Sequence, residues 1–309
     1  MAILVLATSA FVEQQRAALA SLAPDERIHT DPTNAPPADV EALLAFKLSP
    51  GIAPRFPALK FVGCAGAGVD DILRMGDVPL HVPIVRPVDS LQGQRMAQYV
   101  ALMALRFQRD LPRLEAQHRD ASWKRFMAQR ETDCAVGVMG HGSIGAPVVD
   151  IFLRLGFPVA AWTRVPREIG GADSFSGPGG LAPFLARTRI LVCALPLTTA
   201  TRGLLCERTL QLLPRGAYVI NVSRGAILCE ADLVAAVGSG QLAGAAVDVF
   251  ETEPLPAESP LWRHPKILCT PHIAAVPRAE IAAAQFLDNL RRARAGIPLV
   301  NVVDRSREY

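Results

Sequence analysis

The stretch VGVMGHGSIGAPVVDIFLRLG, residues 136–156, contains the clearest structural motif of the chain. A short apolar run leads directly into the loop GHGSIG, and the pattern of a helix follows the loop. In this setting the first glycine permits a tight turn, the second lets a pyrophosphate approach the backbone, and the third lets the helix pack against the strand. The start of the helix also offers unpaired N–H groups and the positive end of its dipole to phosphates. The loop residues expected to bind a dinucleotide are therefore Gly140, His141, Gly142, Ser143, Ile144 and Gly145.

A purely structural glycine turn is the alternative interpretation of this loop. Five further apolar runs of strand length follow it, which favours the binding site: FPVAAWT, RILVCALP, GAYVINVS, AGAAVDVF and KILCTP. Near-continuous apolar runs are typical of strands that are buried on both faces of a parallel sheet. The series that begins at CAVGVMG therefore predicts a Rossmann-type, doubly wound α/β domain.

The residues before this series predict a second α/β lobe. AILVLAT reads as a strand and AFVEQQRAALASLA as a helix, while LKFVGCAGAGVDDI and VPIVRP continue the alternation. A long helical pattern follows from about residue 90, and Pro112 interrupts it. Another helix, from about Ala279 to Ala295, could pack back onto the first lobe. We therefore expect a flavodoxin-like substrate domain of residues 1–98 plus 276–309, with the dinucleotide-binding domain of residues 99–275 inserted in it.

The composition is that of a globular protein and gives no sign of a macromolecular partner. The chain has 309 residues, of which 50% are hydrophobic and 20% charged, so two domains are expected. The net charge of +3 is small and most basic residues are scattered, which argues against nucleic-acid binding. No apolar run approaches the ~18 residues of a membrane span, and MAILVLATSA fits a buried strand better than a signal peptide.

The cysteines and histidines predict neither disulfides nor a metal site. The six cysteines lie far apart without a C-x-x-C pair, which is typical of reduced thiols in the cytoplasm. The six histidines show no metal-ligand spacing, so no metal is expected.

The stretch VAAWTRVPRE, residues 159–168, carries an unusual charge for an NAD site. An acidic residue normally ends this strand, where it binds the ribose hydroxyls and repels a 2′-phosphate. Here the position falls on Thr163, followed by Arg164 and then Arg167. A guanidinium binds phosphate through charge-assisted hydrogen bonds, so we expect NADP as cofactor, with NADPH preferred over NADH. The alternative is that both arginines are solvated loop residues and the cofactor is NAD.

Three polar residues follow later strands of the same domain. Arg224 lies in VINVSRGAI, Glu253 lies in AAVDVFETEP, and His272 lies in ILCTPHIAA. Because ligands bind at the carboxyl ends of the strands in this fold, all three should face the crevice of the glycine loop. Hydride transfer to a ketone leaves an oxyanion, to which a histidine can give a proton, while a neighbouring carboxylate orients the ring and an arginine holds the substrate. Each residue alone has a structural explanation; together with the glycine loop they favour catalysis.

The order of motifs resembles the D-isomer-specific 2-hydroxyacid dehydrogenase family along nearly the whole chain. The motifs are GCAGAGVDDI, MGHGSIG, LPLTTATRGLL, INVSRGAILCEADLVAAVGSGQLAGAAVDVFETEPLP and TPHIAA. Within the family, AGAGVDDIL, WKR and WTR are most similar to the glyoxylate/hydroxypyruvate reductase branch. The resemblance implies NADPH-dependent reduction of small 2-oxo acids, a homodimer joined through the cofactor domain, and two lobes that close over the substrate.

The resemblance also implies roles for particular residues. Arg224 would bind and polarise the substrate, His272 would be the acid/base and Glu253 would tune it. Asp248 would contact the nicotinamide carboxamide. Backbone N–H groups around residues 65–67 would bind the substrate carboxylate. The remaining residues assigned to the two binding sites are Ala65, Gly66, Ala67 and Phe46 for the substrate, and Leu195, Pro196, Val222 and Ser223 for the cofactor.

One departure leaves the substrate open. The branch commonly carries a tryptophan in the substrate loop, where this chain has LLAFKLSP with Phe46 and Lys47. An NAD-dependent enzyme for another substrate, such as phosphoglycerate or formate, is one alternative. A dinucleotide-sensing protein without activity is the other, although the complete set of Arg224, Glu253 and His272 argues against it.

Overall fold

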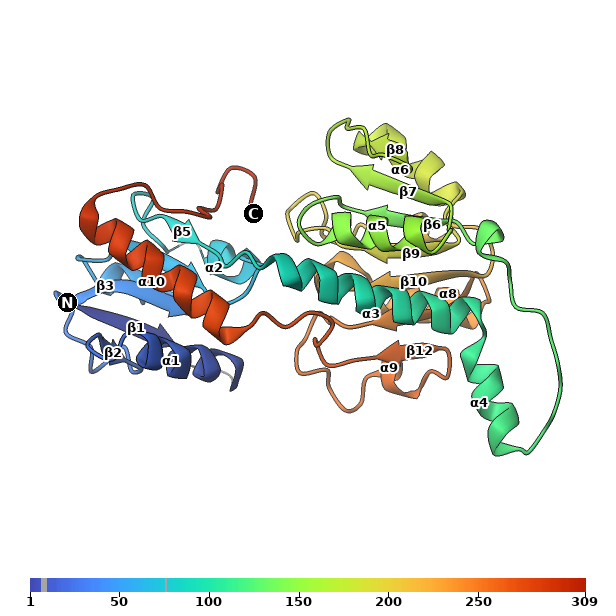
Figure 1. The fold of residues 1–309 in the computed structure, drawn as a ribbon, viewed down its shortest axis with the longest axis horizontal. Coiled ribbons are helices and arrows are strands. Elements are labelled where there is room, and N and C mark those ends of the chain that lie inside the picture. Colours follow the sequence, from blue (N-terminus) through green and yellow to red (C-terminus); the bar gives the residue numbers. More distant parts are fainter. Residues whose placement is uncertain (7–9, 76) are drawn as a thin grey trace. The chain divides into compact units, whose positions relative to one another are not determined.

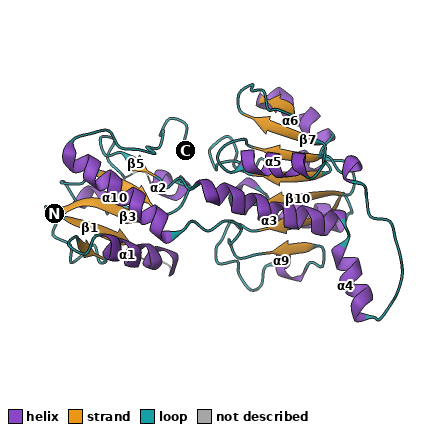
Figure 2. Cartoon of the chain, viewed as in Figure 1, coloured by secondary structure: helices purple, strands orange, loops and turns teal. Residues whose placement is uncertain are grey.

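The chain folds into two compact units. The computed structural model describes residues 1–6, 10–75 and 77–309. One unit consists of Met1–Asp89 with Pro277–Tyr309, and the other of Ser90–Val276. Each unit is built on one parallel β-sheet that carries helices, as the colouring by secondary structure in Figure 2 shows.

The first domain boundary lies at Ser90, not at residue 99 as the sequence suggested. The reason is that helix α3 (Ser90–Gln108) packs as one piece along α5 (Gly145–Arg154). Met96 and Val100 of α3 share a buried cluster with Val148 and Phe152 of α5. The second boundary follows Val276, one residue beyond the expected position.

The unit of Met1–Asp89 and Pro277–Tyr309 has a five-stranded sheet in the order β2-β1-β3-β4-β5, which is the flavodoxin-like order (Figure 1). Its alternating side chains fill two cores. Ile3 and Val5 pack with α1 and α10 on one face, whereas Leu4 and Leu6 pack with α2 on the other. The elements are β1 (Ala2–Leu6), α1 (Ala10–Leu22), β2 (Arg27–His29), β3 (Val40–Ala45), β4 (Phe61–Cys64), α2 (Asp70–Met75), β5 (Ile84–Val85) and α10 (Ala279–Ala295).

The unit of Ser90–Val276 has a seven-stranded sheet in the order β12-β11-β10-β9-β6-β7-β8. Counted from β6, this is the 3-2-1-4-5-6 order of a dinucleotide-binding fold with one further strand. Helices α3 and α5 cover one face, while α6 and α8 cover the other. The elements besides α3 and α5 are α4 (Leu111–Arg119), β6 (Val136–Met139), β7 (Val159–Thr163), β8 (Asp173–Ser176), α6 (Gly177–Ala186), β9 (Ile190–Cys193), α7 (Glu207–Leu210), β10 (Ala217–Asn221), α8 (Glu230–Gly238), β11 (Leu242–Val247), α9 (Pro260–Arg263) and β12 (Ile267–Cys269).

The long helical pattern divides where Pro112 predicted an interruption. Helix α3 ends at Gln108, Asp110 adopts a left-handed conformation with φ +49°, and Pro112 then lies in the first turn of α4. A proline is tolerated there because the first N–H groups of a helix have no intrahelical partner. Within the described residues, no helix is long and apolar enough to cross a membrane.

Candidate active site

The glycine loop has the backbone that its sequence predicted. Gly140 has φ +95°, in the left-handed region that glycine adopts without strain. A Cβ at Gly145 would lie 2.0 Å from the Gly140 carbonyl oxygen, so only glycine lets α5 begin this close to the strand. A Cβ at Gly142 would meet no atom of the described residues within 4 Å. The loop therefore leaves open space at the start of a ten-residue helix, where a phosphate can approach N–H groups.

The end of β7 places basic residues where NAD enzymes carry an acid. Thr163 is buried, and its hydroxyl donates a hydrogen bond to the Val165 carbonyl at 2.8 Å. Arg164 follows and is exposed. Arg167 reaches back to the glycine loop, where its Nη1 donates to the His141 carbonyl at 2.8 Å. Burial and then the charge of Arg167 lower the pKa of His141, so the arginine supplies the positive charge there at neutral pH.

The ends of β9 and β10 bring four more predicted cofactor residues together. The Val222 N–H donates to the Cys193 carbonyl at 3.3 Å. The Ser223 hydroxyl donates to the carbonyl of Leu195, which Pro196 follows. These residues therefore lie at the carboxyl ends of two neighbouring strands, where this fold binds its ligands.

His272 and Glu253 form a hydrogen-bonded pair. His272 Nδ1 lies 2.8 Å from Glu253 Oε2, and Glu253 Oε1 accepts the Phe250 N–H at 2.9 Å. Burial alone raises the pKa of Glu253, but the hydrogen bond with His272, then that from Phe250, and the charges of His272 and Arg224 bring it below the ordinary value. The carboxylate is therefore ionised at neutral pH. Because it engages Nδ1, the nitrogen left to exchange a proton is His272 Nε2.

A glycine lets the loops that carry Arg224 and Glu253 touch. Arg224 follows β10, and its Nη1 donates to the Ser223 carbonyl at 2.8 Å. A Cβ at the next residue, Gly225, would lie 1.8 Å from the Phe250 carbonyl carbon, which no side chain permits. Since β10, β11 and β12 are neighbours in the sheet, Arg224, Glu253 and His272 follow three adjacent strands at the same edge.

Asp248 has partners in the protein that the sequence did not indicate. It is 1% exposed, its Oδ1 accepts Thr270 Oγ1 at 2.5 Å and the Ile273 N–H at 3.0 Å, and its Oδ2 accepts the Ala274 N–H at 2.9 Å. The carboxylate therefore holds the turn that carries His272. Its contact with nicotinamide stays a prediction.

Asn221 is a further buried polar residue that sequence reasoning missed. It is fully buried at the end of β10, its Nδ2 donates to the Arg224 carbonyl at 3.2 Å, and its Oδ1 accepts the Ser223 N–H at 3.2 Å. The signal in the sequence was an asparagine at the end of an apolar strand. A side-chain amide buried there must form hydrogen bonds within the protein. Asn221 thus shapes the turn from which Arg224 projects.

In the unit of Met1–Asp89 and Pro277–Tyr309, the predicted substrate residues lie together. The Phe46 ring packs against Gly66, where a Cβ would lie 2.8 Å from Phe46 Cε2. The Ala65 N–H already donates to the Ala45 carbonyl at 2.9 Å, which corrects the assignment of that N–H to the substrate carboxylate. Gln15 and Arg86 fix the loop by donating to the carbonyls of Ala65, at 2.6 Å, and Ala67, at 3.3 Å. Gly66 and Ala67 remain as the predicted donors.

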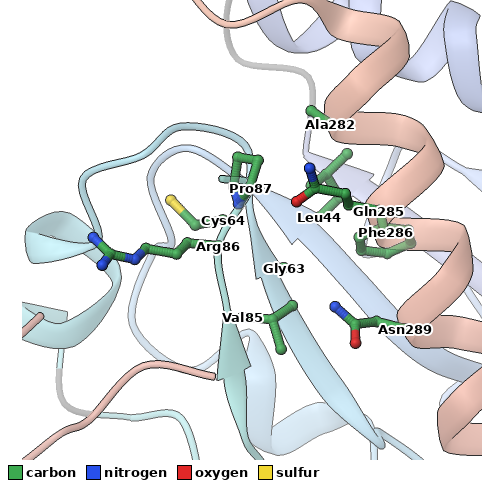
Figure 3. Close-up of a pocket in the computed structure, with 10 residues that line it drawn as sticks. All are labelled: Leu44, Gly63, Cys64, Val85, Arg86, Pro87, Ala282, Gln285, Phe286 and Asn289. Carbon is green, nitrogen blue, oxygen red and sulfur yellow. The ribbon is translucent and has the colours of Figure 1, made fainter. Parts of the chain in front are cut away.

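A cavity in this unit is too small to be the substrate site. Figure 3 shows it between the β4–β5 region and α10, with Cys64, Arg86, Gln285 and Asn289 among its lining residues. Its volume of about 10 Å³ has room for one water molecule at most. A 2-oxo acid cannot enter it.

Comparison with known proteins identifies the family. A family model described as "D-isomer specific 2-hydroxyacid dehydrogenase, NAD binding domain" matches residues 101–274, more than half of the chain. The chain belongs to the D-isomer specific 2-hydroxyacid dehydrogenase family. The matched part of this dehydrogenase contains the glycine loop and Arg224, Glu253 and His272. It is therefore an oxidoreductase, as its motifs indicated.

Similar proteins indicate the branch of the family to which this dehydrogenase is most similar. "Glyoxylate/hydroxypyruvate reductase A" of Salmonella choleraesuis (strain SC-B67) is 40% identical over 256 residues, which cover 81% of this chain and 82% of that protein. The protein of the same name from Klebsiella pneumoniae (strain 342) is 39% identical over 257 residues, 82% of each chain.

Solved structures agree with this assignment. A D-isomer specific 2-hydroxyacid dehydrogenase of Xanthobacter autotrophicus Py2, in complex with NADPH and MES, is 38% identical with a TM-score of 0.90 over 100% of this chain and 99% of that one. An NADPH-dependent glyoxylate/hydroxypyruvate reductase of Sinorhizobium meliloti, in complex with NADP and sulfate, is 33% identical with a TM-score of 0.91 over 100% of both chains. The two α/β units of this dehydrogenase, each with a parallel sheet, thus have the same fold as its relatives.

Proposed function

We propose that this dehydrogenase reduces small 2-oxo acids, such as glyoxylate and hydroxypyruvate, to 2-hydroxy acids with NADPH. The observation that carries the proposal is the bonded pair of His272 and Glu253, which follows strands adjacent to that of Arg224. The name of the Salmonella and Klebsiella relatives supports the substrate class.

The glycine loop and the end of β7 fit NADPH. Gly142 faces open space at the start of α5, as close approach of a pyrophosphate requires. Thr163 replaces the acid that would repel a 2′-phosphate, and the exposed Arg164 can bind this group, with Arg167 as a second candidate. The NADPH and NADP complexes of the Xanthobacter and Sinorhizobium structures support this choice. Further contacts are assigned to Leu195, Pro196, Val222, Ser223 and Asp248.

The residues of this chain supply binding and a proton. NADPH, when bound, supplies a hydride to the ketone carbon. Arg224 holds the substrate carboxylate and polarises the ketone. His272 donates a proton from Nε2 to the substrate oxygen, while Glu253 orients the ring through Nδ1 and stabilises its charged form. In the unit of Met1–Asp89 and Pro277–Tyr309, the N–H groups of Gly66 and Ala67 are assigned to the carboxylate.

The alternatives are less well supported. Formate oxidation needs no pair of residues that exchanges a proton with the substrate. The hydrogen-bonded pair of His272 and Glu253 would then have no role in the reaction. A phosphoglycerate enzyme usually takes NAD, which the basic end of β7 does not favour. A sensing protein without activity has no need for the complete set of Arg224, Glu253 and His272.

Initial rates with a panel of 2-oxo acids, each run with NADPH and with NADH, test the proposal. We expect turnover of glyoxylate and hydroxypyruvate, faster with NADPH than with NADH at equal concentration. An absence of turnover with every small 2-oxo acid contradicts the function. Tight NADPH binding without turnover would favour the sensing protein.

We also propose a homodimer joined through the unit of Ser90–Val276. Helix α4 has no buried residue, and Figure 1 shows α4 and the chain after it lying away from the sheet of their own unit. In that chain Trp123 is 90% exposed and Met127 95% exposed, so both apolar side chains are available for contact with a second copy. Light scattering should give twice the 33.1 kDa of one chain, and the variant Trp123→Ala with Met127→Ala should give one chain.

The state of the cysteines supports a proposed cytoplasmic location. All six cysteines are free thiols. Proteins of oxidising compartments tend to form disulfides, whereas cytosolic thiols are kept reduced. If cells are lysed in denaturant with an alkylating reagent, the isolated protein should therefore carry six alkylated cysteines.

A further inference from the structure

One face of α3 holds the segment that carries His272. Gln92 Nε2 donates to the Ala275 carbonyl at 2.9 Å, and Arg95 Nη1 donates to the Val276 carbonyl at 3.0 Å. One turn further along the helix, the Tyr99 hydroxyl lies 2.6 Å from Thr270 Oγ1. The spacing of three and then four residues places all three side chains on the same side of the helix. Helix α3 therefore contacts residues 270–276 on both sides of His272.

The hydrogen bonds of Tyr99 and Thr270 have a defined direction. Asp248 is a buried carboxylate and can only accept, so Thr270 donates its proton to Asp248 Oδ1. The remaining lone pairs of Thr270 Oγ1 then accept the Tyr99 proton. Burial raises the pKa of Tyr99 to about 12, so the hydroxyl keeps the proton that it donates to Thr270 in the neutral range.

The turn at His272 needs such support. His272 has φ +53°, a left-handed conformation that non-glycine residues rarely adopt unless the surroundings hold it. Its N–H donates to the Asp248 carbonyl at 2.9 Å. The Asp248 carboxylate accepts the N–H groups of the next two residues, Ile273 and Ala274. Asp248 therefore stabilises the turn. The hydrogen bond from Thr270, which itself accepts one from Tyr99, holds the Asp248 carboxylate in place.

The same helix also contacts the glycine loop. A Cβ at Gly93 of α3 would lie 2.4 Å from the Ser143 carbonyl oxygen and 2.9 Å from Pro147 Cγ. Consecutive residues of α3 therefore serve both loops, since Gln92 binds the His272 segment and Gly93 packs on the glycine loop. The helix is a common support for the dinucleotide loop and the histidine.

We propose that Tyr99 is a positioning residue for His272, acting through Thr270 and Asp248, and that α3 thereby sets the place of the acid/base relative to the glycine loop. The inference rests on the proposed function for the role of His272. The hydrogen-bond chain itself can be tested without turnover.

Hydrogen exchange of the full-length protein provides the first test. Tyr99→Phe removes one hydroxyl, and Thr270→Val removes the next one at nearly constant shape. Both should increase amide exchange in the segment 272–276, where Asp248 accepts N–H groups, by about tenfold or more, the loss expected when a buried hydrogen bond is broken. Thr270→Ser keeps the hydroxyl and should leave exchange unchanged. Tyr218→Phe is the matched control, because Tyr218 is buried and stacks on Phe107 of the same helix but forms no hydrogen bond to the described residues 270–276.

Kinetics with glyoxylate and NADPH provide the second test. Tyr99→Phe and Thr270→Val should each lower kcat by about tenfold, because a small displacement of the acid/base is costly to catalysis, while the Kd for NADPH stays within about twofold. The double variant should lose no more than either single variant, since both break one chain. Thr270→Ser and Tyr218→Phe should keep kcat.

The outcomes separate the two ideas. Unchanged exchange of residues 272–276 in Tyr99→Phe overturns the positioning role, whatever the activity. Increased exchange with unchanged kcat overturns it as well. A wild-type protein without turnover of any 2-oxo acid contradicts the proposed function, while the exchange result still decides whether Tyr99 holds the turn.

Discussion

The Glu253 carboxylate binds His272 with one oxygen and the backbone N–H of Phe250 with the other. Oε2 lies 2.8 Å from His272 Nδ1, and Oε1 accepts the Phe250 N–H at 2.9 Å. The backbone bond fixes the carboxylate, and the fixed carboxylate in turn fixes the imidazole. The ring therefore has one orientation before any substrate binds, which is how a proton donor is prepared for catalysis.

Replacing this carboxylate should impair catalysis without unfolding the protein. Glu253→Gln keeps the shape but removes the charge that stabilises a protonated ring, so kcat for glyoxylate should fall by about a hundredfold. Glu258→Gln, a change at an exposed glutamate five residues further on, is the control and should keep wild-type kcat. A Glu253→Gln enzyme with wild-type kcat would remove Glu253 from the mechanism.

Two glycines of one loop should respond differently to alanine. At Gly142 a Cβ meets no described atom within 4 Å, so Gly142→Ala should keep the Tm of the free protein yet weaken NADPH binding by about tenfold or more. At Gly145 a Cβ would lie 2.0 Å from the Gly140 carbonyl, so Gly145→Ala should lower the Tm itself. Calorimetry and fluorescence titration of both variants check this. Equal NADPH affinity in Gly142→Ala and wild type would place the pyrophosphate elsewhere.

The exposed Arg164 should select the cofactor. Its guanidinium is expected to form charge-assisted hydrogen bonds with the 2′-phosphate, so Arg164→Ala should reduce the ratio of kcat/KM for NADPH to that for NADH by about tenfold. Arg187→Ala, which removes an arginine paired with Asp173, is the control and should leave the ratio unchanged. If Arg164→Ala also leaves it unchanged, Arg164 is an ordinary solvated residue.

Stability should depend on pH through Glu26 and Arg294. Arg294 on α10 donates to Glu26 Oε2 at 2.8 Å and also pairs with the buried Glu41. The hydrogen bond from Arg294 lowers the pKa of Glu26 below its ordinary value of 4.5. A lowered pKa in the folded state contributes stability above the ordinary pKa, and this contribution is lost as the pH falls through the folded value. The Tm difference between wild type and Glu26→Gln should therefore be largest above pH 4.5 and shrink below it; a constant difference would contradict the pairing.

Much of the fold could be predicted from the sequence, because its signals are local. The apolar runs at Val136–Met139 and Ala217–Asn221 are strands, and the helix predicted from Ala279 to Ala295 has these bounds. The strands Arg27–His29 and Asp173–Ser176 were missed because they lie at sheet edges, contain no fully buried residue and lack an apolar pattern. The boundary at Ser90 was missed because the packing of α3 on α5 is a tertiary contact.

The site was predictable in its residue types and not in its connections. The sequence indicated Glu253 and His272 because polar residues beside buried strands require partners or a function. The structure contains a hydrogen bond between the two. Nothing in the sequence indicated that Tyr99, 171 residues before Thr270, would bind it. Partners that are distant in the chain become visible only when the helix is placed on the sheet.

The rate of NADPH oxidation with glyoxylate, measured in parallel for wild type and His272→Ala, tests the role of His272 as proton donor. We expect steady turnover by the wild type, and in His272→Ala a loss of about a hundredfold or more in kcat with NADPH still bound. Turnover by His272→Ala at the wild-type rate would contradict this role, because the proton would then come from another group.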